Sequence, residues 1–174
     1  MILPSRRLLW IGAALLGAAI GVSIWGFQPA WFVFAFAVVV VTLGDAFAAT
    51  RLVTPAVARR VPASLAVGVR TEVALRVAAA GKQRLVLHDH HPASFEAEGL
   101  PRSLALGAGQ WTELRYQVRP VARGETRFGR AELRLASPLG LWEAKRFSGE
   151  EQAVRVYPNF RALAKYTLLA TDNR

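Results

Sequence analysis

The sequence predicts a transmembrane α-helical hairpin followed by an all-β domain, an antiparallel β-sandwich of about seven strands. Two observations lead to this fold class. Positions 8 to 50 contain a single charged residue, Asp45, whereas positions 51 to 174 carry 20 Lys and Arg against 11 Asp and Glu. Beyond Pro55, apolar residues recur with a period of two and glycines separate the runs, which is typical of short, half-buried strands joined by turns.

The chain is expected to have three parts, since 174 residues suit one modest core plus membrane segments. We expect a membrane anchor over 1–50, a cytoplasmic β-sandwich over 51–158, and a short connector or C-terminal tail over 159–174. As a free end the tail would form only a short, marginal helix. We therefore interpret the chain as the N-terminal half of a longer protein. A complete, independent small membrane protein is the alternative.

Two apolar segments form the expected anchor. Residues 8–25 carry no charge and would span about 27 Å as a helix, close to the hydrocarbon thickness of a bilayer. Residues 31–49 are long enough to do the same. The intervening "GFQPA" (26–30) is too short for anything but a reversal, and Pro29 lacks the N–H that a continuous helix needs. The two segments are therefore expected to form a hairpin.

Basic residues predict the orientation of this hairpin. Arg6 and Arg7 precede the first segment, and Arg51, Arg59 and Arg60 follow the second, whereas the connecting loop has none. The positive-inside rule then places both chain ends in the cytoplasm. A secretory signal peptide is the competing interpretation of the first segment, but the second apolar stretch follows within six residues.

Two features inside the apolar segments suggest contacts. Gly17 and Gly21 form a GxxxG pair, which lets another helix approach closely. We expect that helix to be the second one of the same hairpin, with dimerisation as the alternative. Asp45 lies six residues before Arg51, near the inner boundary, so we interpret it as an interfacial residue rather than an intramembrane functional carboxylate.

The alternation in the second part defines the strands. In 71–77, Val73, Leu75 and Val77 share one face, and 113–119 shows the same pattern with Leu114, Tyr116 and Val118. One apolar face in a period of two indicates a strand packed on a core. The expected strands are 71–77, 84–88, 113–119, 125–128, 131–136, 141–147 and 153–158.

All three histidines of the chain fall in "HDHHP", residues 88–92. If a strand continues through this stretch, Asp89 shares the buried face with Leu85 and Leu87, and the imidazoles of His88 and His90 point outward. Two imidazoles need further ligands to hold a metal, and the rest of the chain contains no other histidine and no cysteine. We therefore expect no metal site. We interpret Asp89 as bonded to local backbone N–H groups before the turn at Pro92.

Composition narrows the classes of function. The net charge of +10 favours an anionic partner surface, and Arg6, Arg7, Arg51, Arg59 and Arg60 are the predicted contacts with anionic lipid. Nucleic acid is not expected, because the arginines are spread over the whole second part without a recognition motif. No cofactor and no catalytic centre are expected either. The paired carboxylates, Glu96 with Glu98 and Glu150 with Glu151, are interpreted as loop residues.

A tight turn gives the most specific motif. Pro138 at the second turn position presets φ, and Gly140 suits the fourth. The motif set comprises Arg123, Gly124, Ser137, Pro138, Gly140, Leu141 and Trp142. Together with Phe128-Gly129, Leu133 and the "VYP" of 156–158, this order of motifs resembles the bacterial membrane proteins called domain of unknown function family 58. Ser137 departs from that family, in which the turn commonly begins with Asp.

The resemblance implies a fold and a role. It covers nearly the whole chain and implies two transmembrane helices followed by a β-rich domain in the bacterial cytoplasmic (inner) membrane. It further implies work beside a MoxR-type AAA+ ATPase in the assembly or maturation of protein complexes. The family's von Willebrand factor A-like domain is missing from these 174 residues, so its metal-ion adhesion site has no counterpart here. We expect a membrane-anchored, non-catalytic binding or scaffold module. An envelope-side β-sandwich binding module is the alternative.

Overall fold

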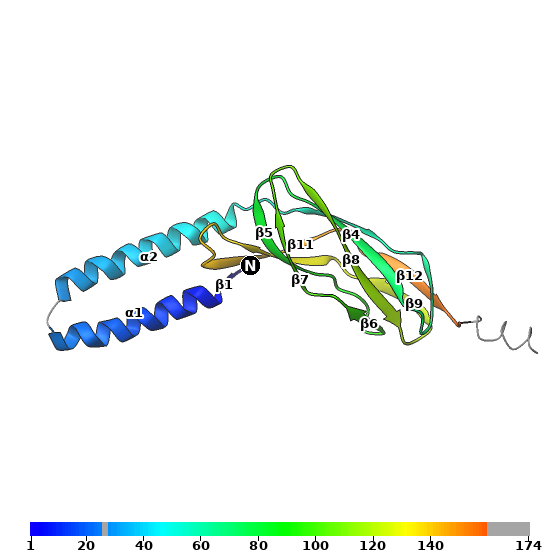
Figure 1. Cartoon of the computed structure of the whole chain (residues 1–174), viewed down its shortest axis with the longest axis horizontal. Helices are drawn as coiled ribbons and strands as arrows, with labels where there is room; N and C mark the ends of the chain where they lie inside the picture. Colours follow the sequence, from blue (N-terminus) through cyan, green and yellow to red (C-terminus); the bar gives the residue numbers. More distant parts are fainter. Residues whose placement is uncertain (26–27, 160–174) are drawn as a thin grey trace, which may run out of the picture.

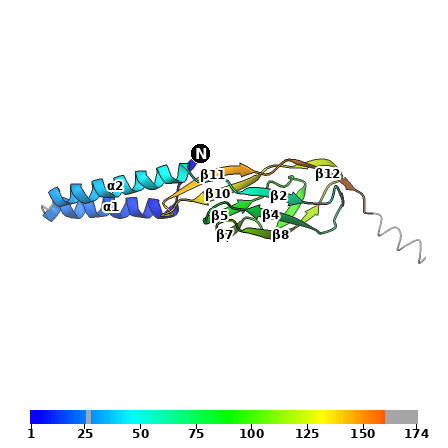
Figure 2. The same cartoon turned by 90° about the horizontal axis from the view of Figure 1, so that it is seen from above.

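Two long helices project side by side from one end of a β-rich domain, as Figure 1 and the perpendicular view in Figure 2 both show. The structure, a computed structural model, describes residues 1–25 and 28–159. Helix α1 spans Arg6–Trp25 and helix α2 spans Gln28–Thr50. By length and composition both can cross a membrane, with mean hydropathies of 1.8 and 2.2. Their apolar side chains are largely exposed, unlike those of a helix in a soluble core.

The helix ends differ from the expected ones. Helix α2 begins at Gln28, so Pro29 lies in its first turn, where a missing N–H removes no helical hydrogen bond. The expectation that residues 26–30 form the connecting loop is therefore wrong at its C-terminal end. The expected packing of the GxxxG pair is also wrong at Gly17, because a Cβ built there would meet no atom within 4 Å. The predicted tail lies outside the described residues from position 160 onward.

Within the described residues, twelve strands form three sheets. The first sheet has the order β1-β11-β10-β5-β7, the second β2-β4-β8-β6, and the third β3-β12-β9. All pairs are antiparallel except β3 with β12, which is parallel. The strands are β1 (Ile2–Pro4), β2 (Ala56–Arg60), β3 (Ser64–Ala66), β4 (Thr71–Ala78), β5 (Gln83–His88), β6 (Phe95–Glu98), β7 (Arg102–Leu106), β8 (Trp111–Pro120), β9 (Gly124–Phe128), β10 (Ala131–Ala136), β11 (Trp142–Ser148) and β12 (Gln152–Tyr157).

The seven expected strands coincide with β4, β5 and β8 to β12, within one residue at every end except the start of β8, which lies two residues before the expected one. The expected number of strands was too low, because β1, β2, β3, β6 and β7 were not predicted. Of these, β1 and β3 have three residues and β6 has four, which is too short for a recognisable alternation. The structure thus has two apolar helices followed by a β-rich domain with several antiparallel sheets.

The core is one cluster of apolar side chains shared by the sheets. The predicted alternation is confirmed: Val73, Leu75 and Val77 of β4 have no exposed surface. Neighbouring β8 adds Leu114, Tyr116 and Val118, while β5 and β10 of the other large sheet add Leu85, Leu87, Leu133 and Leu135. Apolar area removed from water in this way is the main stabilising contribution to such a domain.

The N-terminal residues belong to the β-rich domain. Strand β1 pairs antiparallel with β11, and the Lys145 amide donates a hydrogen bond of 2.9 Å to the Met1 carbonyl. Because α1 begins two residues after β1, both ends of the helical pair are held at the same end of the domain. Strand β12 ends at the opposite end in both views (Figure 1).

Candidate functional site

A tight turn between β10 and β11 lies where the helices meet the β-rich domain. We call residues 137–142 the junction turn. The Gly140 amide donates to the Ser137 carbonyl at 2.9 Å, and the Ser137 amide donates to the Trp142 carbonyl at 2.9 Å. Gly140 has a φ of 72°, in the left-handed region where a glycine has no steric penalty. The predicted turn is therefore confirmed, and the structure adds its location.

Asp45 of α2 accepts hydrogen bonds from this turn. Its Oδ1 accepts from the Leu139 amide at 2.9 Å, and its Oδ2 accepts from Ser137 Oγ at 2.5 Å and from the Leu141 amide at 3.2 Å. The residue is 4% exposed. Asp45 therefore faces the β-rich domain and bonds to the junction turn, and its place near the inner membrane boundary stays a prediction. Three donors on one carboxylate satisfy a charge that would be costly to bury alone.

Two further contacts attach the helices to the same turn. Ser5 Oγ accepts from the Leu8 amide at 3.3 Å, as an N-cap of α1, and donates to the Gly140 carbonyl at 2.8 Å. The Trp142 indole Nε1 donates to the Thr42 carbonyl of α2 at 2.9 Å. Both helices thus contact the junction turn by directed hydrogen bonds, which fix the orientation of the β-rich domain relative to the helical pair.

The predicted lipid-contact arginines separate into two groups. Arg6 and Arg7 are exposed in the first turn of α1, and Arg51 is exposed one residue after α2. Arg60 is also exposed, at the end of β2. The side chain of Arg59 is only 5% exposed and forms an ion pair with Asp89, so its assignment as a lipid contact is wrong.

Arg59 and Asp89 form a buried network with Tyr116. Arg59 Nε donates to Asp89 Oδ2 at 2.9 Å, its Nη2 donates to Asp89 Oδ1, and Tyr116 Oη donates to Asp89 Oδ2 at 2.6 Å. Arg59 also donates to the Gly129 carbonyl at 2.6 Å and lies over the Phe128 ring. Burial and the neighbouring Asp89 raise the pKa of Tyr116. Asp89 is buried as predicted, but its side-chain partners are distant in sequence rather than local backbone groups.

The histidines lie on the outer face of β5 and just beyond it. The rings of His88 and His90 are 5.2 Å apart, and His90 Nε2 lies 3.3 Å from Glu132 Oε2. Glu132 also accepts from Lys145 Nζ at 2.8 Å and Arg134 Nε at 3.0 Å. Burial opposes ionisation of Glu132, but these hydrogen bonds outweigh it and lower its pKa to about 2. Across residues 1–25 and 28–159, no group of three or more His, Asp or Glu side chains is placed to hold a metal.

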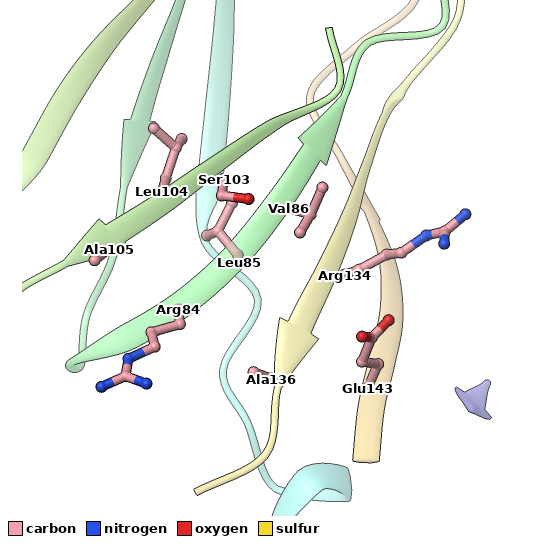
Figure 3. A pocket seen from close by; sticks show the side chains of 9 residues that line it. All are labelled: Arg84, Leu85, Val86, Ser103, Leu104, Ala105, Arg134, Ala136 and Glu143. Carbon is pink, nitrogen blue, oxygen red and sulfur yellow. The ribbon is translucent and has the colours of Figure 1, made fainter. Parts of the chain in front are cut away.

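An open groove of about 360 Å³ crosses the outer face of the first sheet over β7, β5, β10 and β11 (Figure 3). Val86, Ala105 and Ala136 contribute apolar surface to it. Arg84 and Arg134 lie at opposite sides of the groove in Figure 3. The groove combines apolar surface with basic side chains and one carboxylate, that of Glu143.

Other predicted residues lie away from the junction. Arg123 and Gly124 form the exposed entry to β9, near the end of the domain opposite the helices (Figure 1). The expectation that Glu96 and Glu98 lie in a loop is wrong, because both are on β6. Glu96 pairs with Arg119 at 3.5 Å and Glu98 with Arg70 at 3.1 Å, so these carboxylates take part in exposed ion pairs.

One feature of the sequence points to the junction. Asp45 is the single charge in positions 8 to 50, and an isolated carboxylate in an apolar helix needs partners. Those partners are 92 to 96 positions away, so no local pattern connects them. Ser5 and Thr42, which also contact the turn or its tryptophan, were missed for the same reason.

No family model matches this sequence, and no curated protein does. Among solved structures, the crystal structure of the CARDB domain of the PF1109 protein from Pyrococcus furiosus, in complex with di-metal ions, is similar over 62% of this chain and 90% of that chain, with 11% identity and a TM-score of 0.39. The solution structure of the same domain covers 59% of this chain and 93% of its own, with 12% identity and a TM-score of 0.36. These low TM-scores carry no conclusion about activity or ligands.

Proposed function

We propose that this chain is a membrane-anchored, non-catalytic binding or scaffold module. In this proposal α1 and α2 cross the bilayer and hold the β-rich domain at the inner face of a bacterial cytoplasmic membrane. The observation that carries the proposal is the junction of Asp45 with the turn at Ser137 to Leu141. A flexible tether would need no such junction, whereas a platform that presents a surface in a defined orientation does.

The basic residues support the orientation. Arg6, Arg7 and Arg51 lie at the helix ends next to the β-rich domain, and positions 26–30 carry no charge. A positive charge excess beside the domain favours the cytoplasmic side. An active periplasmic reporter fused at position 174, with an inactive one at position 28, would contradict this topology and favour the envelope-side alternative.

The partner part of the proposal depends on the sequence resemblance. That resemblance implies a MoxR-type AAA+ ATPase as the partner and complex assembly or maturation as the process. A von Willebrand factor A-like domain, on the same or another polypeptide, is the second partner that it implies. The exposed groove over β5 and β10 and the exposed ion pairs of the other sheet are surfaces on which such partners can dock.

The direct test uses the full chain in lipid nanodiscs. A MoxR-type ATPase from the same organism is titrated onto immobilised nanodiscs, with empty nanodiscs as the control. We expect saturable binding that depends on the chain. Absence of binding with and without ATP would contradict the partner assignment. Turnover by the same preparation in a panel of hydrolase assays would contradict the non-catalytic assignment.

A further inference from the structure

A second cavity lies at the junction, beside the groove of Figure 3. Its volume is about 380 Å³, and its charged lining residues are Arg7, Lys82 and Arg84, with no carboxylate among the residues that line it. Arg7 comes from α1, Lys82 from the segment between β4 and β5, and Arg84 from β5. Arg84 and Ala136 line both this cavity and the groove. Three cations from separate elements therefore converge on one hollow.

The Asp45 carboxylate lies behind the junction turn, bonded to Ser137 and Leu139 of the lining, and forms no ion pair with these cations. Within the described parts of the chain, no ion pair or side-chain hydrogen bond involves the Arg7, Lys82 or Arg84 head groups. Other exposed arginines do form ion pairs, namely Arg70, Arg115, Arg119, Arg127, Arg134 and Arg155. Arg7 Nη1 lies 3.6 Å from the position of a Cβ on Gly140, which places the guanidinium against the junction turn. A concave basic site attracts an anion.

Gln83 provides a second, independent observation. It lines the same cavity, is 8% exposed, and donates from Nε2 to the Val53 carbonyl at 2.8 Å. Because that carbonyl can only accept, the amide nitrogen must face it, and Oε1 is the remaining acceptor. This buried Oε1 has no hydrogen-bond partner. An unsatisfied buried acceptor is costly, so a ligand with a hydroxyl donor would complete it.

The location of the cavity selects the source of the anion. Arg7 lies in the first turn of α1, and Leu52, which also lines the cavity, follows α2 by two residues. Both apolar helices therefore end at the level of the cavity, where lipid headgroups lie if the helices cross a bilayer. Leu139, a further lining residue, is 55% exposed and offers apolar surface beside the basic side chains.

We propose that this cavity binds the headgroup of an anionic, hydroxyl-bearing glycerophospholipid. Arg7, Lys82 and Arg84 contact the phosphodiester, and Gln83 Oε1 accepts a hydrogen bond from a headgroup hydroxyl. This assignment rests on the membrane anchorage proposed above. It adds a specific binding site, one bound lipid per chain, to the general attraction of basic residues for an anionic membrane.

The test titrates lipids into the full chain in a neutral detergent and counts bound lipids by native mass spectrometry. The probes are phosphatidylglycerol, phosphatidylmethanol with the same charge but no headgroup hydroxyl, phosphatidylcholine, and inorganic phosphate. We expect one phosphatidylglycerol to bind about tenfold or more tighter than phosphatidylcholine, and severalfold tighter than phosphatidylmethanol. Equal affinity for all three lipids would overturn the proposal. Competition by millimolar inorganic phosphate would assign the site to a free anion instead.

A charge-matched pair of variants separates the site from general surface charge. K82Q/R84Q removes two cations from the cavity, and R102Q/R123Q removes two exposed cations outside it. We expect the first to weaken phosphatidylglycerol binding by about tenfold or more and the second to leave it unchanged. Equal losses in both would overturn the proposal. Because ATPase binding and topology play no part in this assay, failure of the scaffold proposal is detected separately.

Discussion

Asp45 and Ser137 are 92 positions apart, and their side chains are joined by a hydrogen bond of 2.5 Å inside the junction between α2 and the β-rich domain. Ser137 Oγ also accepts from the Trp142 amide at 3.0 Å. The serine hydroxyl thus acts both as a donor to the helix and as an acceptor within the turn. This arrangement accounts for a serine at a turn position where an aspartate would place a second carboxylate against Asp45.

The first prediction concerns Asp45→Ala. The substitution leaves Ser137 Oγ and the amides of Leu139 and Leu141 without their acceptor. A buried donor that is left without a partner costs up to about 3 kcal/mol. We therefore expect the junction to loosen. The free energy of unfolding should fall by about 2–4 kcal/mol in total. Limited proteolysis of the full chain in nanodiscs should show faster cleavage near residues 51–55.

Thr42→Ala is the matched control for Asp45→Ala. Thr42 lies on the same helix, and its hydroxyl bonds only to the Val38 carbonyl of that helix. The backbone carbonyl that accepts from Trp142 is kept. We expect no change in cleavage near residues 51–55. If both variants are cleaved at the wild-type rate, Asp45 does not hold the junction together.

The second prediction concerns the buried pair of Arg59 and Asp89. Arg59→Met removes the cation and leaves Asp89, which has no exposed surface, with Tyr116 as its remaining side-chain partner. Breaking one side of a buried ion pair typically costs about 3–5 kcal/mol. We expect a loss of that size in chemical unfolding followed by near-ultraviolet circular dichroism. Arg60→Met, one residue further and exposed, should change the stability by less than about 0.5 kcal/mol.

The Arg59 result shows what sequence patterns can and cannot predict. The alternation around Val73 and Leu114 was readable because every second residue is apolar and the partner strands need not be known. In β2 the same period puts Arg59 on the face of Val57, so burial of the arginine was readable too. The positive charge of Arg59, however, favoured the prediction of an exposed side chain, because a buried charge needs a partner. That partner is 30 positions away.

The junction likewise has features that local sequence patterns predict and features that depend on residues far apart in the sequence. Turn chemistry at Pro138 and Gly140 is local, and the structure confirms the turn. Helix length is also local, and both apolar segments are helical. The contact of the turn with Asp45 depends on how the helices meet the sheet, which no period in the sequence encodes. The cavity formed by Arg7, Lys82 and Arg84 depends on the same arrangement, so it was not predicted.

The third prediction concerns Gly140→Ala. Gly140 has a φ of 72°, and an alanine in the left-handed region costs about 1–2 kcal/mol. We expect the free energy of unfolding to fall by that amount, as measured by chemical denaturation. Gly81→Ala is the matched control, because Gly81 has a negative φ and no atom within 4 Å of an added Cβ. A destabilisation in Gly81→Ala equal to that in Gly140→Ala would contradict the conformational explanation.

The fourth prediction concerns the pH dependence that Glu132 produces. Hydrogen bonds from Lys145, Arg134 and His90 outweigh the effect of burial and lower the pKa of Glu132 from 4.5 to about 2. A carboxylate with a depressed pKa in the folded state contributes stability above its unfolded-state pKa and loses it as the pH falls through its folded-state pKa. We therefore expect a loss of up to roughly 3 kcal/mol between about pH 4.5 and pH 2, measured as the thermal unfolding midpoint in a pH series.

Glu132→Gln should lose this pH dependence and be less stable at pH 7. Glu125→Gln removes an exposed carboxylate paired with Arg155 and should keep the wild-type profile, since exposed ion pairs contribute little. A wild-type profile in Glu132→Gln would show that other groups cause the acid loss.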